Sequence, residues 1–387
     1  MTPDAADSFG TMAAAYVHIP FCSTICPYCD FAVVAGRDEQ AGRYVSAVVA
    51  EIAMSESWRP LDAVYFGGGT PSHVAPSLLG SILEALAHKH GIAGDAELSL
   101  EANPEDFVTT TARDLREIGF NRVSFGAQSF DTAVLESLGR RHGPREIVAS
   151  ADAATRAGFE RLSVDLIYGD PVETIDSWAE TVGHSLALGT GHISCYALTV
   201  EGGTPLGRAV AGGDPAPDPD AQADRHELAD ALLATAGLPR YEVSNWAKPG
   251  EECRYNMVVW AQGEYEAYGN GAHGFRDGVR FRNHRRLDAY MTRVERGERP
   301  RSGEDVISGW DAELDRLFVG LRRRSGAGLG SGTEALLASD EGRDLIRAGV
   351  IAVVGDRLVV RQPLLTDAVH RSILGLPAPI VIGHGNA

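Results

Sequence analysis

The sequence predicts an α/β fold in which a partial (β/α)6 barrel of the TIM type precedes a smaller C-terminal α+β domain with a winged-helix-like arrangement. Six strand-like runs alternate with helical patterns from the start of the chain. Near residue 301 the pattern changes to short helices and then a hairpin. We therefore expect the barrel over 12–236, a connecting segment over 237–300 and the C-terminal domain over 301–376.

The expected strands are short runs rich in Val, Ile and aromatic residues. They cover residues 15–20, 63–66, 97–101, 122–125, 162–168 and 192–198. The helical stretches between them cover residues 44–56, 77–89, 110–118, 144–156 and 174–188. Such β-α units in series predict a parallel sheet, and a curved sheet can close partly into a barrel. Active sites of β/α barrels are built at the carboxyl ends of the strands, so chemically suggestive residues are expected there.

Beyond the sixth strand the sequence pattern predicts secondary structure less clearly. The segment 211–222 is poor in apolar residues and contains three prolines, which predicts a loop. Helices are expected over 225–236, 312–321 and 333–338. The run GVIAVVGDRLVV predicts a hairpin that turns at Gly355 and Asp356.

The charge balance excludes some classes of partner. The 387 residues include 53 acidic and 35 basic side chains, a formal net charge of -18. This charge repels phosphate backbones, and no basic recognition helix is present, so nucleic acid is not expected as a partner. The first eleven residues have no basic start or apolar run, and no later stretch has eighteen uninterrupted apolar residues. We expect a cytoplasmic protein without stable membrane insertion.

Five cysteines are present, and three of them stand within eight positions. Cys22, Cys26 and Cys29 form a C-x3-C-x2-C pattern on a loop directly after the first strand. An odd count with this spacing suits metal ligation better than a disulfide framework. Cys195 and Cys253 stand alone and are expected to be small buried residues.

Three thiolates suit an iron-sulfur cubane that leaves one iron free for an exchangeable ligand. Zinc is the alternative, but a structural zinc site normally has four protein ligands. No nearby Cys or His pair supplies a fourth ligand. His18 could do so, although a histidine within a strand is more often packed or hydrogen-bonded.

The cysteine pattern resembles the signature of the radical S-adenosylmethionine (SAM) superfamily. The resemblance implies a 4Fe-4S cluster on Cys22, Cys26 and Cys29, with the amino and carboxylate groups of SAM on the open iron. In that superfamily an electron from the cluster cleaves SAM to methionine and a 5'-deoxyadenosyl radical. Catalytic residues beyond these cofactor ligands are not assigned.

Three further motifs follow in the order of the superfamily. FGGGTPS at 66–72 implies contacts from Gly68, Gly69 and Thr70 to the methionine part of SAM, since glycines permit close backbone approach. SLEANPE places Glu101 at the end of the third strand, and RVSFGAQSFD places Gln128 after the fourth. A carboxylate and an amide there can hydrogen-bond a ribose and an amino acid group. Taken alone, a glycine-rich turn with positive φ would be the better explanation of FGGGTPS, and a helix-capping or rim ion-pair role would be a credible one for Glu101.

The resemblance extends to other cofactor-lining positions. It implies a SAM contact for Arg140 in LESLGRRH and for Asp165 within LSVDLIYGDP, where a buried acid needs a partner. Tyr16, Tyr28 and Ala197 also match lining positions. Core packing explains the two tyrosines nearly as well.

Within the superfamily the chain resembles the coproporphyrinogen dehydrogenase-like group, and most closely the heme chaperones called HemW. The resemblance covers nearly the whole chain and includes YEVSNWAKPG at 241–250 and GNGAHGF at 269–275. The dehydrogenase pattern is C-x3-C-x2-C-x-C, with a fourth cysteine two positions after the third. This chain has Phe31 at that position. The first barrel strand also begins near the start of the sequence. Oxidative decarboxylation of coproporphyrinogen is therefore the less favoured activity.

One motif departs from the chaperone pattern. The HemW pattern includes H-N-x-x-Y-W in a segment associated with heme. This chain has Tyr255 at the histidine position and Val259 at the tyrosine position. Tyrosine can also ligate heme iron, so heme binding stays open; His273 is a further candidate ligand.

Three hypotheses follow. The first is a chaperone whose partners are heme, an acceptor hemoprotein and a reductant such as flavodoxin or ferredoxin. The second is an oxygen-independent coproporphyrinogen III oxidase-like enzyme that acts on a porphyrin or another small molecule. The third is a structural zinc or redox protein.

Overall fold

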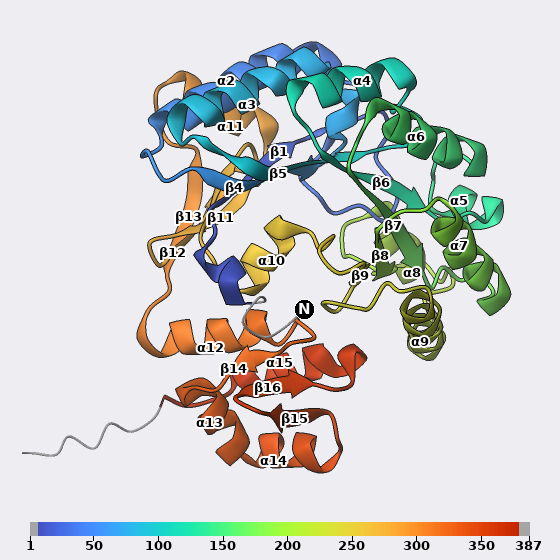
Figure 1. The fold of residues 1–387 in the computed structure, drawn as a ribbon, viewed down its shortest axis with the longest axis vertical. Coiled ribbons are helices and arrows are strands. Elements are labelled where there is room, and N and C mark those ends of the chain that lie inside the picture. The colour runs from blue at the N-terminus through green and yellow to red at the C-terminus, as the bar shows by residue number, and fades with distance from the viewer. Residues whose placement is uncertain (1–6, 379–387) are drawn as a thin grey trace, which may run out of the picture.

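The computed structural model describes residues 7–378, and its centre is an 11-stranded sheet in the order β13-β12-β11-β10-β1-β4-β5-β6-β7-β8-β9. Six consecutive strands of this sheet are parallel. They are β1 (Ala14–Ile19), β4 (Leu61–Gly68), β5 (Ile92–Ala102), β6 (Arg122–Gln128), β7 (Arg161–Tyr168) and β8 (His192–Ala197). The predicted six-stranded partial barrel is confirmed, and in Figure 1 it forms an open crescent.

Residues after the barrel extend the sheet at both edges. β10 (Tyr265–Tyr268) pairs in parallel with β1. β11 (His273–Arg276), β12 (Val279–Asn283) and β13 (Arg301–Val306) continue that edge in antiparallel order. β9 (Asn245–Ala247) pairs antiparallel with β8 at the opposite edge. The sheet therefore ends in β13 and β9, and these edges do not pair with each other.

Helices cover the convex face of the sheet (Figure 1). The larger ones are α2 (Ala41–Met54), α3 (Pro76–Lys89), α4 (Thr109–Ile118), α6 (Pro144–Ala157), α7 (Ile175–Ala187), α9 (Pro219–Thr235) and α11 (Leu287–Glu295). Shorter helices are α5 (Thr132–Ser137) and α8 (Pro205–Ala211). Inside the crescent lies α10 (Arg254–Trp260), which carries the altered motif (Figure 1).

The loop expected over 211–222 is shorter in the structure. Ala211 still belongs to α8, and α9 begins at Pro219. The Asp218 carboxylate caps this helix by accepting hydrogen bonds from the N–H groups of Asp220 and Ala221. A proline in the first helical turn is favourable because its missing N–H is not needed there. Composition alone therefore placed the start of α9 too late.

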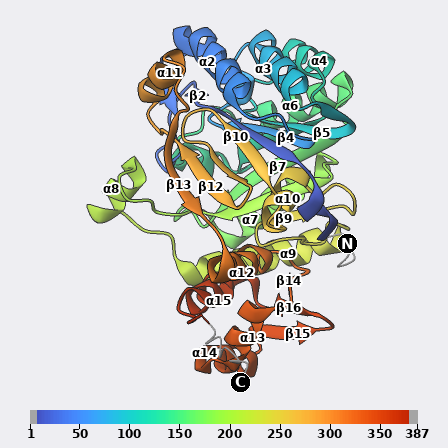
Figure 2. The same ribbon diagram turned by 90° about the vertical axis from the view of Figure 1, so that its left-hand side faces the viewer.

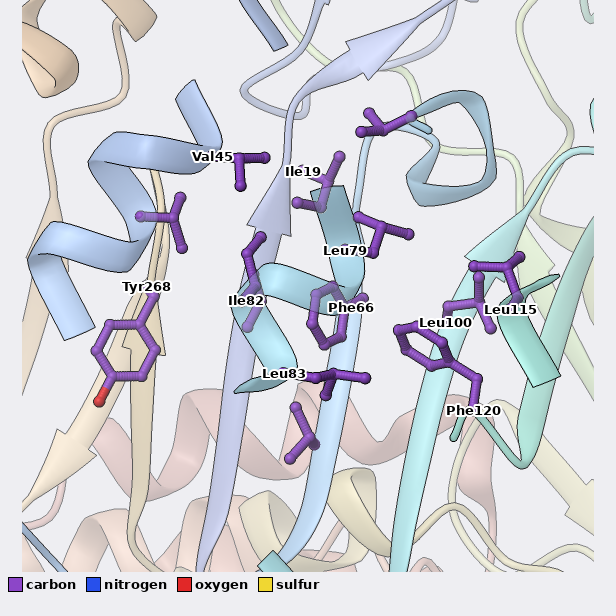
Figure 3. Packing of buried hydrophobic residues seen from close by; sticks show 14 of the residues in the cluster. Ile19, Val45, Phe66, Leu79, Ile82, Leu83, Leu100, Leu115, Phe120 and Tyr268 are labelled. Atoms are coloured by element: carbon purple, nitrogen blue, oxygen red, sulfur yellow. The ribbon is translucent and has the colours of Figure 1, made fainter. Parts of the chain in front are cut away.

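The main core lies between the sheet and its outer helices (Figure 3). Ile19, Phe66 and Leu100 of three neighbouring strands are completely buried. Phe66 meets Phe120 edge to face, with 5.1 Å between ring centroids. Full burial stabilises each such side chain by about 1.5–3 kcal/mol, which explains why apolar residues recur along these strands.

The C-terminal unit, residues 309–376, has its own core. It comprises α12 (Gly309–Gly320), β14 (Ala327–Gly328), α13 (Ser331–Ala338), α14 (Asp340–Arg347), β15 (Ile351–Val354), β16 (Arg357–Val360), the 3-10 helix η4 (Pro363–Leu365) and α15 (Thr366–Leu374). The predicted hairpin is confirmed: β15 and β16 pair across Gly355, which has φ 62°. Figure 2 shows α12 and α15 on the side of this unit that faces the barrel.

Asp7 joins the N-terminal segment to the C-terminal unit. Its carboxylate accepts from Arg323 at 3.1 Å and from Arg357 at 2.6 Å, and both arginines are buried. The next residues form η1 (Phe9–Thr11), which packs against α10. Among residues 7–378, no helix combines the length and the apolar character needed to cross a bilayer.

Candidate functional site

A cavity of about 980 Å³ opens at the carboxyl ends of the parallel strands. It lies where barrel enzymes build their sites, and its volume is at the upper end for small-molecule pockets. All predicted site residues except Tyr16 line it, namely Cys22, Cys26, Tyr28, Cys29, Gly68, Gly69, Thr70, Glu101, Gln128, Arg140, Asp165 and Ala197. Motifs far apart in the sequence therefore meet around one space.

The cysteine loop is hydrogen-bonded to the glycine motif at the end of β4. Gly69 N–H donates to the Ile19 carbonyl at 2.8 Å, and Thr70 N–H donates to Phe21 at 2.8 Å. A Cβ on Gly69 would stand 2.7 Å from the Ile19 carbonyl oxygen. Only glycine permits this approach, so the motif fixes where the loop leaves β1.

A chain of polar contacts connects two of the cysteines. Arg140 donates to Cys26 Sγ at 3.2 Å and to Asn103 Oδ1 at 2.5 Å. Asn103 Nδ2 donates to Thr70 Oγ1 at 3.1 Å, and Thr70 Oγ1 donates to Cys22 Sγ at 3.6 Å. Donors aimed at sulfur stabilise thiolate character and tune an iron-sulfur cluster. Asn103 was not predicted from the sequence, although it follows Glu101 within the same motif.

The three thiols are free and partly buried. Burial raises the pKa of Cys22 to about 11 and also raises that of Cys29 despite the nearby Arg140, so both thiols stay protonated at neutral pH unless a metal binds them. Iron would supply the charge that these soft donors need as thiolates, so the donor chemistry fits a cluster. Within residues 7–378, no three His, Cys, Asp or Glu side chains are placed to hold a single metal ion.

His18 is a packed and hydrogen-bonded residue. Its Nδ1 lies 3.1 Å from the Tyr16 hydroxyl, and its Nε2 lies 3.0 Å from the Ala32 carbonyl oxygen. Burial lowers the pKa of His18 to about 4. Both ring nitrogens already have partners, which favours the structural interpretation over a fourth metal ligand.

Two carboxyl groups form the acidic wall of the cavity. Glu101 accepts from the Tyr65 hydroxyl at 2.9 Å and from Gly68 N–H at 3.0 Å. Burial, and then the nearby Asp165, raise the pKa of Glu101 to about 7. Burial also raises the pKa of Asp165, which accepts from Ser124 at 2.8 Å. Glu101 is thus a hydrogen-bond acceptor whose charge changes near neutral pH.

Gln128 has φ 66°, a left-handed conformation that a side chain other than glycine rarely adopts. It follows a register shift between β6 and β7 at Phe125. The irregularity brings Gln128 to the cavity wall. Strain of this kind persists where the surrounding structure enforces it, and it is concentrated at functional sites.

Tyr16 is the predicted site residue that does not line the cavity. Its ring stacks on Tyr65 and Tyr255, with centroids 6.4 Å and 5.8 Å away. Tyr255 also stacks on Tyr65 at 5.3 Å and meets Tyr265 edge to face. The altered motif residue therefore packs among aromatic rings inside the barrel, and it does not line the cavity either.

The sequence interpretation missed several lining residues. Arg322, Leu364 and Asp367 come from the C-terminal unit, while Val243 and Ser244 come from the YEVSNW segment. That segment was singled out as a motif, which is the one signal that pointed to it. Nothing in the local sequence marks Arg322, because only the docking of the C-terminal unit brings it to the cavity.

Comparison with known proteins agrees with this geometry. Residues 16–184 match the family model described as the radical SAM superfamily. The heme chaperone HemW of Mycobacterium tuberculosis is 37% identical, over 96% of this chain and 97% of that protein. The Escherichia coli protein of the same name is 34% identical, over 73% and 74% of the two chains. The structure of E. coli coproporphyrinogen III oxidase (HemN) superposes with a TM-score of 0.81 at 22% identity, over 96% and 92% of the chains, which shows a shared fold.

Proposed function

Because this chain belongs to the heme chaperone HemW family of the radical SAM superfamily, we propose that it holds a 4Fe-4S cluster and SAM and delivers heme to an acceptor hemoprotein in the cytoplasm. The observation that carries the proposal is the single cavity in which the three cysteines face the glycine motif, Glu101, Gln128 and Asp165.

Cys22, Cys26 and Cys29 would hold the cluster, with Arg140 and Thr70 donating to two of the sulfurs. When bound, the cluster supplies the electron for reductive cleavage of SAM, delivered by a reductant such as flavodoxin or ferredoxin.

The other lining residues would position SAM. Gly68 and Gly69 line the cavity beside Thr70, so their backbone groups would contact the methionine part. Glu101 and Gln128 would accept and donate hydrogen bonds at the ribose and the amino acid group. Asp165 lies on the same wall as Glu101 and would accept a further hydrogen bond.

Heme would bind to residues other than those at the H-N-x-x-Y-W positions. Tyr255 is packed between Tyr16 and Tyr65, so its hydroxyl is not presented to the cavity wall. The space between the cysteine loop and the C-terminal unit is part of the same cavity and is open to a larger ligand.

The test begins with anaerobic reconstitution. Iron and sulfide analysis separates a cluster protein from a zinc protein. A heme titration followed at the Soret band then tests the chaperone function in the wild type and in Tyr255→His. We expect saturable binding to the wild type, and a wild type that binds no heme would overturn the chaperone proposal. Decarboxylation of coproporphyrinogen coupled to 5'-deoxyadenosine formation would instead establish the oxidase.

A further inference from the structure

The C-terminal unit supplies one wall of the cavity. Arg322 directly follows the C-cap of α12, and Pro363, Leu364, Thr366 and Asp367 come from η4 and the start of α15. These residues lie in the same cavity as the cysteine loop, which is more than 290 positions away in the sequence. A ligand in the cavity can therefore touch the barrel and the C-terminal unit together.

Arg322 has the buried Glu242 within electrostatic range but forms no ion pair with it. Within residues 7–378 its side chain forms no ion pair and no hydrogen bond, and its buried Nε has no acceptor. Its guanidinium lies 4.7 Å from the centre of the Trp260 ring, a cation-π contact with α10. The neighbouring Arg323 and Arg357 differ, because both bind Asp7. A desolvated guanidinium normally has hydrogen-bond acceptors, so Arg322 has donors to spare.

The charges around Arg322 leave room for an anion. Glu242 is buried and interacts with Arg322 only through space. Asp367 lines the cavity but forms no ion pair with Arg322. The other guanidinium of the cavity, that of Arg140, already donates to Cys26, Asn103 and the Gly126 carbonyl.

The cavity that Arg322 lines also has apolar walls. Leu364 is 41% exposed despite lining the cavity. Further apolar side chains in the lining come from Leu198, Ala223, Val243 and Pro363. A guanidinium and several apolar side chains in one cavity match a ligand with a broad apolar body and a carboxylate at its edge.

We propose that Arg322 binds a propionate carboxylate of a tetrapyrrole whose apolar body lies in this part of the cavity. The inference rests on the proposed heme-carrying function and identifies the residue that recognises the ligand. A planar guanidinium can hold a carboxylate through two parallel hydrogen bonds, and its stacking on Trp260 holds it in one orientation. The C-terminal unit is thus part of the ligand site.

A purely structural role for Arg322 makes a different prediction. If the residue only attaches α12 to α10 through Trp260, its replacement lowers the thermal stability and does not change which ligand is preferred. Ligand discrimination therefore separates the two roles.

The experiment compares hemin with hemin dimethyl ester, whose propionates are esterified, by titrating the reconstituted full chain. We expect the wild type to bind hemin about tenfold more tightly than the ester, because the ester loses a charge-assisted hydrogen bond. Arg322→Gln should weaken hemin binding about tenfold and bind the ester as the wild type does. Arg322→Lys keeps the charge but loses the two-point geometry, so it should lie between them.

Arg324→Gln is the matched control, since Arg324 is exposed and does not line the cavity. It should behave as the wild type. Equal affinity of the wild type for hemin and its ester would overturn the role of Arg322 while leaving heme carriage intact. A wild type that binds neither porphyrin would overturn the proposed function itself. Melting temperature and iron content of each variant show whether its fold is retained.

Discussion

Replacing Gly69 with alanine tests how the glycine motif positions the cysteine loop. The added Cβ would lie 2.7 Å from the Ile19 oxygen, 2.7 Å from the Pro20 carbonyl carbon and 2.9 Å from the Phe21 oxygen. All three are backbone atoms, so the chain must move by roughly 0.5 Å to restore normal contact, which costs about 1–3 kcal/mol. The two 2.8 Å backbone bonds that connect this motif to the loop would lengthen.

We expect Gly69→Ala to lower the melting temperature of the apoprotein by several degrees and to reduce the iron retained after reconstitution. The control is Gly183→Ala within α7, where a Cβ meets no atom within 4 Å. That exposed helical site should gain about 0.5–1 kcal/mol. Equal melting temperature and equal iron content in Gly69→Ala and the wild type would refute the argument.

Other substitutions test separate parts of the site. The pKa of Glu101, raised to about 7, predicts that SAM affinity falls as the pH drops below 7, and Glu101→Gln should flatten that profile in a binding titration. Because this folded pKa exceeds the usual 4.5, the wild-type apoprotein should also lose stability as the pH rises from about 5 through 7, and less so in Glu101→Gln. Gln128→Gly should relieve a backbone strain of about 1 kcal/mol yet weaken SAM binding, so unchanged affinity would argue against a ligand role. Asp7→Asn removes the carboxylate charge that binds Arg323 and Arg357 and should cost about 1–3 kcal/mol in chemical denaturation.

The barrel was predictable because its strands are buried on both faces. In β7 the apolar residues Leu162, Val164, Leu166 and Ile167 recur within a short run, and this pattern can be recognised without knowledge of the partner strands. The edge strands lack such a signal. β13 (Arg301–Val306) has the sequence RSGEDV and is mostly exposed, so only its pairing with β12 makes it a strand. The local sequence pattern therefore predicts the central strands of the sheet but not its edge strands.

The site residues that could be predicted from the sequence also differ from those that could not. Residues such as Glu101 lie at strand ends within motifs, and parallel topology alone brings them together. Tyr16 lies within a strand rather than at its end, so its ring meets the aromatic stack inside the barrel. Arg322 depends on docking of the C-terminal unit, a contact that no local pattern records.

The proposed function depends on a cluster held by Cys22, Cys26 and Cys29 with one iron open to SAM. The most direct measurement is the electron paramagnetic resonance spectrum of the reduced, anaerobically reconstituted protein before and after SAM is added. We predict about four iron atoms per chain and a spectrum that changes on SAM addition, with both lost in Cys26→Ser. A wild-type protein without iron and sulfide, or a cluster whose spectrum is indifferent to SAM, would contradict the account.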